Sequence, residues 1–469
     1  MEMTNDDKSD RIKQDHIQNI VKGIIPSTKN RSNDSDGYTK DADKNEYYEL
    51  AEAKNTVKYI KHFVKRMKPI IDQNSAKPKD YDKWTEKEQI KHIVDNIKTY
   101  IPNIPQSLLF FIPGTLYRGD CDRNSMDKPL WLDMEKFQRG QKFVLDHFMS
   151  IGLANLLSLF QIFAFTDGLK PLIFSQQSHT PYLAFKRYLS TACYVRNWMT
   201  EDPWTVGTRA YNDIQTVRRM HRAIRLKLCE HDTEEIDMAT KIPNPLCLDR
   251  ETILEDLTSC PYPTVENGCI HLLIKPKGLN QADMAATQFA FMGLILLYPQ
   301  EFGVYASDED MAAFCHTWRG IGYLLGMEDQ YNFCRGSLKE IKQRSRDFIE
   351  VWAKPYLTQV MPEWEHMLKC IMEGNSYYFG GFTFKMALLF VTNLINIDMP
   401  RTRSTLTYYE WFKLILVQYF IIPYVIRIRF IKEFLNKKVH KKLNEAVKYG
   451  PKKHMEIKKR SQKILTEGR

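Results

Sequence analysis

The stretch IGLANLLSLFQIFAF, residues 151–165, carries no charged side chain over its fifteen positions. A helix rises about 1.5 Å per residue, so this segment would be about 22 Å long, which is short for a membrane span. A helix that is apolar on every side is usually buried in the core of a protein. The stretch therefore predicts the central buried helix of a helical domain.

Amphipathic helical patterns lie on both sides of this stretch, and the alternation typical of strands is nearly absent. The fold class is therefore predicted to be all-α, with a single large helical domain over residues 115–396. We expect an irregular region with several prolines at 240–280. Further helices are expected at 135–149, 182–199, 209–230, 281–297, 308–325, 337–353, 356–373 and 383–396.

Three other regions flank this domain. Residues 1–46 are rich in Asp, Lys, Asn and Ser, and they hold too few apolar side chains to offset the entropy of ordering, so they are predicted to be disordered. Residues 47–114 carry charged amphipathic patterns and are predicted to form peripheral N-terminal helices. Residues 404–469 are expected to form an apolar helix followed by a basic helical tail.

The positive charge of the chain is concentrated in this tail. The formal net charge is +10, yet the segment from Arg427 to the C-terminus holds 15 Lys and Arg against 4 Asp and Glu, a net charge of +11. The rest of the chain is close to neutral. The tail also has few aromatic side chains that could stack on bases, so no nucleic-acid partner is expected.

The apolar segment WFKLILVQYFIIPYVIRI, residues 411–428, is the part of the C-terminal region that could contact a membrane. As a helix it would measure about 27 Å, barely enough to cross the hydrocarbon core. Lys413, Pro423 and Arg427 weaken a span, although charges near the ends can reach the surface. The basic tail suits an anionic leaflet. Membrane contact, spanning or interfacial, and packing on the domain's own surface both remain open.

Cysteine usage and the N-terminus indicate the compartment. The nine cysteines are scattered without a CxxC pattern, which is typical of reduced thiols in a reducing environment. The first residues, MEMTNDDKSDR, are charged and lack the apolar stretch of a cleavable signal peptide. The expected location is intracellular, in the cytoplasm or at the endoplasmic reticulum membrane.

The segment TVRRMHRAIRLKL, residues 216–228, holds the candidate site. On a helix, His221 lies at the edge of an apolar face and beside a stripe of arginines that includes Arg218 and Arg225. A neutral imidazole there could coordinate a haem iron while the arginines pair with the two propionates. The alternative is a basic helix surface whose histidine packs against the core, and the spacing alone does not exclude it.

A second candidate element is the preceding helix, AFKRYLSTACYV, residues 184–195. Arg187 and Thr191 are four residues apart and share one face of that helix. Taken alone, they could be an ordinary surface arginine and a threonine that bonds its own helix backbone.

Together these residues resemble the haem-binding pattern of the rubber oxygenase family. The pattern consists of Arg187 and Thr191, followed thirty residues later by His221. This family comprises the latex clearing proteins and the endoplasmic-reticulum-bound mpaB-type oxygenases. Stretches similar to its animal members are LWLDMEKFQRGQKF at 130–143, GLNQADMAATQFAFM at 278–292 and HTWRGIGYLLGM at 316–327. The resemblance covers residues 115–395.

The resemblance implies a globin-like helical core that binds haem b. His221 would be the ligand of the iron, and Arg218 and Arg225 would lie near the propionates. Arg187 and Thr191 would lie at the haem pocket as catalytic residues. Family members use O2 to cleave carbon–carbon double bonds, so the resemblance also implies an apolar, isoprenoid-like small-molecule substrate.

The sequence departs from the family at two positions. The family's distal lysine is replaced by Ser190, and its pocket glutamate falls near Pro171, with Asp167 as the nearest carboxylate. A haem-binding sensor or carrier without turnover therefore remains an alternative. A helical membrane-surface scaffold without a cofactor is another. His316, on a helix that also holds a tryptophan, is predicted to be structural.

Overall fold

The computed structural model describes residues 57–58, 60–259 and 278–467. Within these ranges the chain forms helices, turns and loops but no β-strand, and an isolated bridge joins Arg118 to Asn280. The predicted all-α class is confirmed. The predicted disordered segment 1–46 and residues 260–277 of the predicted irregular region lie outside the described residues.

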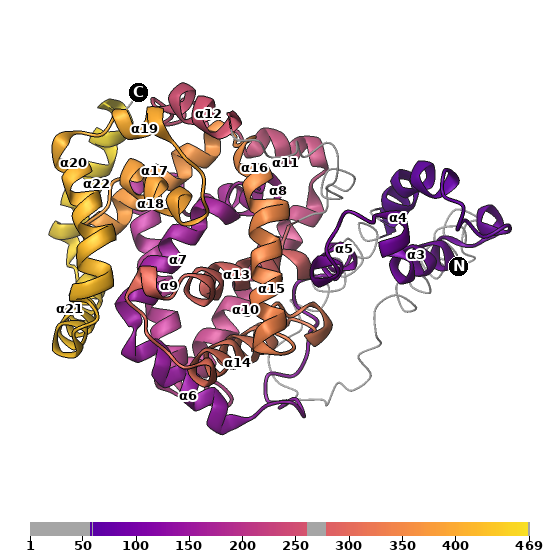
Figure 1. Cartoon of the computed structure of the whole chain (residues 1–469), viewed down its shortest axis with the longest axis horizontal. Coiled ribbons are helices and arrows are strands. Elements are labelled where there is room, and N and C mark those ends of the chain that lie inside the picture. The colour runs from indigo at the N-terminus through magenta and orange to yellow at the C-terminus, as the bar shows by residue number, and fades with distance from the viewer. Residues whose placement is uncertain (1–56, 59, 260–277, 468–469) are drawn as a thin grey trace, which may run out of the picture.

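The apolar stretch 151–165 falls in α7 (Phe148–Ile162), which lies at the centre of the helical body (Figure 1). Leu157 and Phe160 of α7 are fully buried. The helix packs against α13 (Gln281–Leu297) and α18 (Phe384–Leu394). The prediction of a central buried helix is therefore confirmed.

Two close helix contacts complete the body around α7. One joins α6 (Met134–Asp146) to α14 (Asp308–Leu324), and the other joins α9 (Pro181–Thr200) to α17 (Pro362–Ser376). At the first contact a Cβ atom on Gly140 would lie 2.1 Å from Thr317 Oγ1, and at the second a Cβ on Gly374 would lie 2.6 Å from the backbone nitrogen of Phe185. The missing side chains allow the helices to approach this closely.

Several helices begin at a residue whose side chain caps the first turn. Reciprocal capping boxes start α13 at Asn280 and α14 at Ser307, and another at Ser337 starts α15 (Leu338–Phe348). The predicted helix 337–353 continues beyond α15 as the π-helix η7 (Ile349–Ala353), which leads into α16 (Lys354–Leu357).

Sequence patterns missed several shorter elements. The predicted helix 356–373 actually begins at Pro362, because proline fits the first turn of a helix but not its interior. The predicted irregular region 240–280 contains a helix at its centre. The unpredicted helices are α8 (Thr166–Phe174), α11 (Thr233–Ala239) and α12 (Arg250–Thr258), and η5 (Gln300–Phe302) and η6 (Asp329–Tyr331) are short 3-10 turns.

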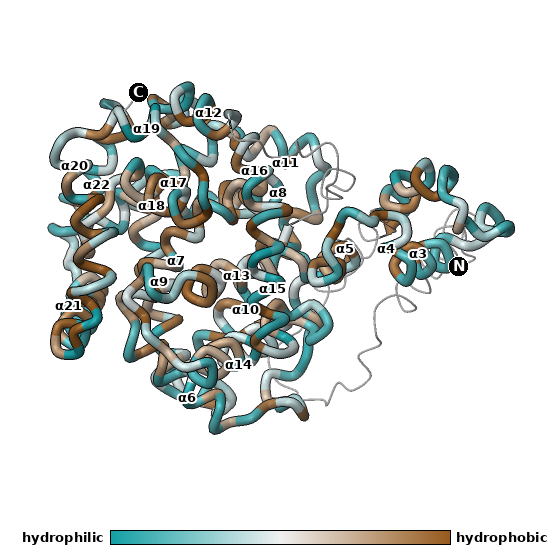
Figure 2. Tube along the Cα trace, viewed as in Figure 1, coloured by the Kyte–Doolittle hydropathy of each residue, from teal (hydrophilic) through white to brown (hydrophobic). Residues whose placement is uncertain are grey.

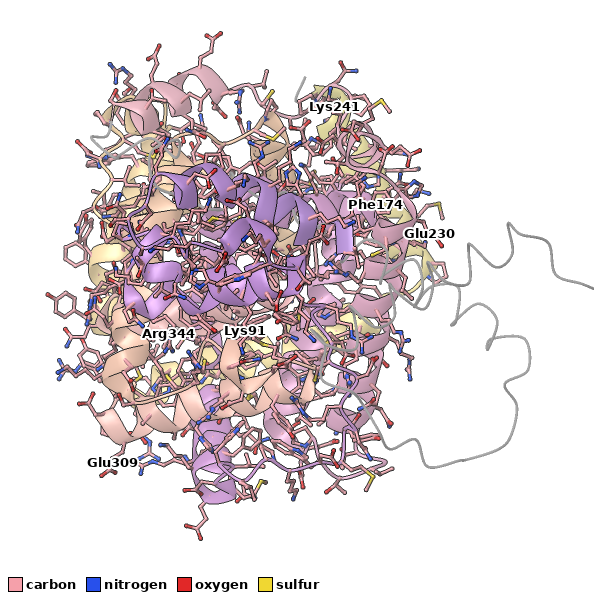
Figure 3. All side chains as sticks on the ribbon, turned by 90° about the vertical axis from the view of Figure 1, so that its right-hand side faces the viewer. Lys91, Phe174, Glu230, Lys241, Glu309 and Arg344 are labelled. Atoms are coloured by element: carbon pink, nitrogen blue, oxygen red, sulfur yellow. The ribbon has the colours of Figure 1, made fainter. Side chains whose placement is uncertain are left out.

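The N-terminal helices project from one side of the body in Figure 1 and lie in front of it in Figure 3. A helix over residues 60–72 is followed by η1 (Tyr81–Lys83), α3 (Glu86–Asp95), α4 (Ile97–Tyr100), η2 (Gln106–Leu108) and α5 (Phe111–Gly114). Ser107 connects this region to the body, because its hydroxyl donates to Asp347 at 2.5 Å and its carbonyl accepts from Arg344. The peripheral placement of 47–114 as a separate unit stays a prediction.

The C-terminal helices run along the edge of the body that is opposite the N-terminal helices (Figure 1). They are α19 (Pro400–Ser404), α20 (Tyr408–Leu416), the π-helix η8 (Val417–Val425), α21 (Arg429–Val447) and α22 (Pro451–Glu467). Among the described residues, no single helix is both long and apolar enough to cross a membrane. Two bent helix pairs are long and apolar enough only when the two helices of each pair are taken together. They are residues 134–162, with a bend of 86°, and residues 408–447, with a bend of 117°.

Candidate functional site

The candidate site lies where α9 packs against α10 (Arg209–Glu230). The hydroxyl of Thr180 caps the start of α9 by accepting from the backbone nitrogen of Leu183. The hydroxyl of Thr208 caps α10 in the same way, accepting from Tyr211 N at 3.1 Å. These caps fix where α9 and α10 begin. The predicted site residues lie on these two neighbouring helices.

His221 of α10 is a neutral imidazole, and part of the residue's surface remains accessible to solvent. Burial, and after it the positive charge of Arg187, lowers its pKa to about 4, while Asp120 acts in the opposite direction. Nδ1 is buried and has no hydrogen-bond partner among the described residues. A neutral imidazole with unused nitrogens is the form in which histidine ligates a metal.

Arg187 of α9 is a second unusual group, since its charge lowers the pKa of His221 across the helix contact. Burial lowers the pKa of Arg187 itself. Its guanidinium donates to Ser175 Oγ at 3.3 Å, and no carboxylate forms an ion pair with it within the described part of the chain. A buried cation without an anion is costly, so this position suits an anionic group of a ligand.

His221, Arg187 and Tyr188 each keep some accessible surface, although burial is the largest cause of each pKa shift. The three side chains therefore belong to a largely desolvated region where α9 packs against α10.

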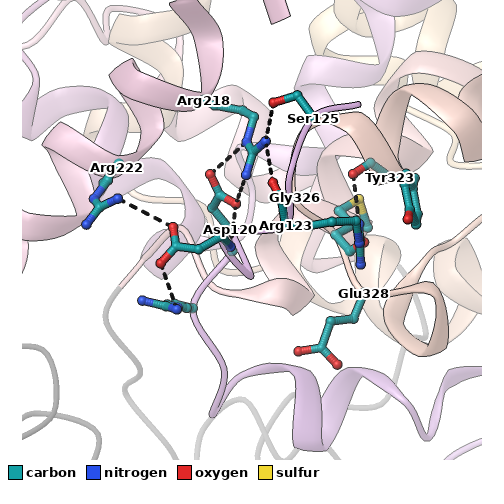
Figure 4. Close-up of polar contacts among 12 residues, drawn as sticks. Asp120, Arg123, Ser125, Arg218, Arg222, Tyr323, Gly326 and Glu328 are labelled. Carbon is teal, nitrogen blue, oxygen red and sulfur yellow. Dashed lines mark hydrogen bonds and ion pairs between the residues drawn. The ribbon is translucent and has the colours of Figure 1, made fainter. Parts of the chain in front are cut away.

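Arg218 occupies the position predicted for a propionate contact, but its donors already have protein partners. Its guanidinium binds both oxygens of Asp120, at 2.9 and 2.6 Å, and also donates to Arg123 O and Ser125 Oγ, each at 3.0 Å (Figure 4). Arg218 thus ties α10 to the loop that precedes α6. Its predicted contact with a propionate stays a prediction.

The same loop binds a second arginine of α10. Asp122 lies 3.4 Å from Arg222 and 2.8 Å from Arg118, both measured between charged atoms (Figure 4). Sequence reasoning missed this pairing, because the partners are about one hundred residues apart. The sequence offered one signal for this pairing, the acidic pair Asp120 and Asp122 together with the two arginines Arg218 and Arg222, which are four residues apart.

Arg225, the other predicted propionate partner, is buried and donates from Nη1 to the carbonyl oxygen of Gly278 at 3.0 Å. It also lies near Asp283, the third residue of α13. Burial raises the pKa of Asp283 to about 7, even though bonds from the Asn280 backbone and the charge of Arg225 act against the rise. This titratable carboxyl was not predicted, since the sequence identifies it only as a capping residue.

The remaining predicted site residues have ordinary partners. The hydroxyl of Thr191 donates to the carbonyl of Arg187 at 3.1 Å, as helix threonines often do. Ser190 is exposed and bonds the backbone of Lys186. Asp167 forms an ion pair of 2.8 Å with Lys170. The catalytic roles of Arg187 and Thr191 stay predictions.

His316 is structural, as predicted. Its Nε2 lies 3.1 Å from the backbone nitrogen of Asp133, and its ring packs edge-on against Trp131 at 5.6 Å. Across the described ranges, no group of three or more His, Cys, Asp and Glu side chains could hold a metal ion.

Comparisons with known proteins add one distant likeness. No protein-family profile and no curated protein sequence matches the chain. Among solved structures, the chain is similar to a latex clearing protein in its closed state, with a TM-score of 0.39 and 14% sequence identity. The match covers 75% of this chain and 88% of that protein. This likeness concerns the helical architecture alone.

The Arg218–Asp120 pair leads to a stability prediction. Arg218→Ala is expected to lower the free energy of unfolding by about 2–3 kcal/mol, because it leaves a largely buried carboxylate without its partner. Urea unfolding would measure the loss. Arg219→Ala, an exposed position on the same helix, should change it by less than about 0.5 kcal/mol. An equal effect of both substitutions would contradict the pairing.

The lowered pKa values of His221 and His316 predict that each ring contributes a loss of stability in mild acid. The folded pKa values of His221 and His316 are both about 4, below the ordinary value of 6.5. At each of these two rings the unfolded chain takes up a proton first, so each ring contributes a loss of about 3 kcal/mol as the pH drops from about 6.5 to about 4. The raised pKa of Asp283 acts in the opposite direction over the same range and offsets part of this loss. Unfolding midpoints at several pH values would show this slope. His316→Gln should make the fall smaller by removing one of the two contributions, and a variant that loses stability in acid just as the wild type does would contradict the prediction.

Proposed function

We propose that this chain is a haem b-dependent oxidoreductase, an oxygenase that uses O2 on an apolar, isoprenoid-like substrate. The observation that carries the proposal is His221, a desolvated neutral imidazole whose Nδ1 has no partner, beside the unpaired cation of Arg187. The order of motifs that resembles the rubber oxygenase family supports the same reading.

His221 would hold the iron, and Arg187 would face an anionic group of the bound cofactor. The haem iron supplies the binding and activation of O2 when the cofactor is bound. Asp283, with a pKa of about 7, can accept or release a proton near neutral pH. Burial raises that pKa, and the charge of Arg225 moderates the rise.

The test begins with the full chain purified from haem-supplemented cells. We expect a Soret band and about one haem per chain. The haem-loaded protein should then consume O2 in the presence of isoprenoid hydrocarbons and release carbonyl products. A colourless protein with full helicity would overturn the proposal.

A haem-binding sensor or carrier is the second candidate. It is favoured by the absence of the pocket glutamate that the resembled family carries. The nearest carboxylate in this chain, that of Asp167, is already paired with Lys170. Haem binding without O2 consumption on any isoprenoid would select this candidate, because the cofactor site would be present without turnover.

A further inference from the structure

Exposed apolar side chains gather on the C-terminal helices. Eleven of the 22 large hydrophobic side chains that are exposed in the described residues lie between Tyr408 and Phe434. Figure 2 shows hydrophobic segments along α20 and α21 at the outer edge of the molecule. Exposed apolar residues scattered singly need no explanation, but a contiguous set on adjacent turns marks an interaction surface.

The exposed set forms a stripe on α20 and η8. Phe412, Leu416, Phe420 and Tyr424 lie four residues apart, and all four are exposed. Trp411, beside this stripe, is about half-exposed at 47%. Residues at this spacing share one face of a helix, so the stripe points outward as a unit.

The opposite face of α20 and η8 is bound to the body. Leu414, Ile422 and Ile426 are buried there. The hydroxyl of Tyr305 donates to the carbonyl of Pro423 at 3.2 Å. Gly303, with φ of 70°, lies so near that an added Cβ would be 2.7 Å from the carbonyl oxygen of Ile422. The outward aromatic stripe is therefore held on a fixed support.

The first half of α21, which follows η8 across a bend of 117°, adds further exposed aromatic side chains and positive charge. Phe430 and Phe434 are exposed, and Lys437, Lys438 and Lys441 follow at helical spacing on the same outward side. Lys437 and Lys438 form no ion pair with any described carboxylate. The inward face is anchored by Asn436, which accepts from Met149 N at 3.0 Å and donates to Asp146 O at 2.8 Å.

We propose that the outward face of residues 408–441, here called the docking surface, binds the interface of a bilayer that contains anionic phospholipids. Aromatic side chains flanked by lysines are the composition that sits at the level of lipid headgroups. Unpaired lysines are attracted by anionic lipids. Because the inward face is packed on the body, the docking surface lies in the plane of the interface.

This proposal is independent of haem binding, and vesicle sedimentation of the full chain tests it. Vesicles would contain phosphatidylcholine alone, or phosphatidylcholine and phosphatidylserine at about 7:3. Binding to the mixed vesicles should be at least about tenfold stronger, and salt at about 0.5 M should remove that preference.

Paired substitutions separate the apolar and the charged contributions. Phe412→Ser with Phe420→Ser should weaken binding to mixed vesicles at least about tenfold. Lys437→Glu with Lys438→Glu should abolish the preference for phosphatidylserine. Met126→Ser with Leu130→Ser, two exposed apolar positions away from the docking surface, is the matched control and should bind like the wild type.

Several outcomes would overturn the proposal. One is that the wild type binds no vesicles. Another is that both docking variants bind the mixed vesicles as strongly as the wild type does, while their circular dichroism spectra are unchanged. Resistance of the bound protein to alkaline carbonate extraction would indicate a spanning segment instead. If the phenylalanine variant turns a dimer into a monomer in sedimentation velocity and still binds vesicles, the surface contacts a second copy of the chain.

Discussion

His221→Ala is expected to yield a folded, colourless protein from cells in which the wild type carries haem. The imidazole is neutral and desolvated, and its Nδ1 has no partner among the described residues, so this substitution removes the proposed iron ligand. The Soret band should disappear, and haem extracted from the purified variant should fall to background.

The control for this variant is His231→Ala, which removes a partly exposed histidine just after the same helix. It should keep the wild-type spectrum. Added imidazole should restore part of the Soret band to His221→Ala, because the free base can enter the space left by the side chain. An unchanged Soret band in His221→Ala would show that another residue holds the iron.

Gly140→Ala is expected to destabilise the fold severely. The added Cβ would lie 2.1 Å from Thr317 Oγ1 and 2.3 Å from the carbonyl oxygen of Ala313, so α6 would have to move away from α14. Both contact atoms belong to a packed helix, and overpacking of this kind costs about 3 kcal/mol or more. Urea unfolding, or loss of soluble protein, would show the effect.

Gly152→Ala on α7 is the matched comparison. A Cβ there meets no atom within 4 Å, and the residue is exposed. The substitution should therefore stabilise the protein by about 0.5–1 kcal/mol through helix propensity alone. If both glycine variants were equally stable, the close contact between α6 and α14 would not exist as described.

The long helices could be predicted from the sequence because their signals are local. Asn280 and Ser307 start helices through bonds to residues three positions away, and the pattern of α10 gives its bounds directly. The π-helical turns after Phe348 and Leu416 could not be predicted, since they depend on tertiary packing around each segment. The short helices α8, α11 and α12 gave too few turns to show a period.

The candidate site was predictable only in part. Arg187 and His221 were named because their order and spacing resemble a family pattern, and they lie on α9 and α10, which pack against each other. The partner of Arg218 is 98 residues away at Asp120, a separation at which no periodic pattern remains. Asp283 was missed for another reason, because burial, which sets its proton affinity, cannot be read from a capping motif.

The low proton affinity of His221 also determines where the chain could keep a metal. Protons compete with a metal for imidazole only below the pKa of the ring, which is about 4 here. A histidine with the ordinary pKa of about 6.5 would already be mostly cationic near pH 5, as in an acidified vesicle. This ring would stay neutral there, so the ligand that we propose for a haem iron would not be lost to protonation in an acidified compartment.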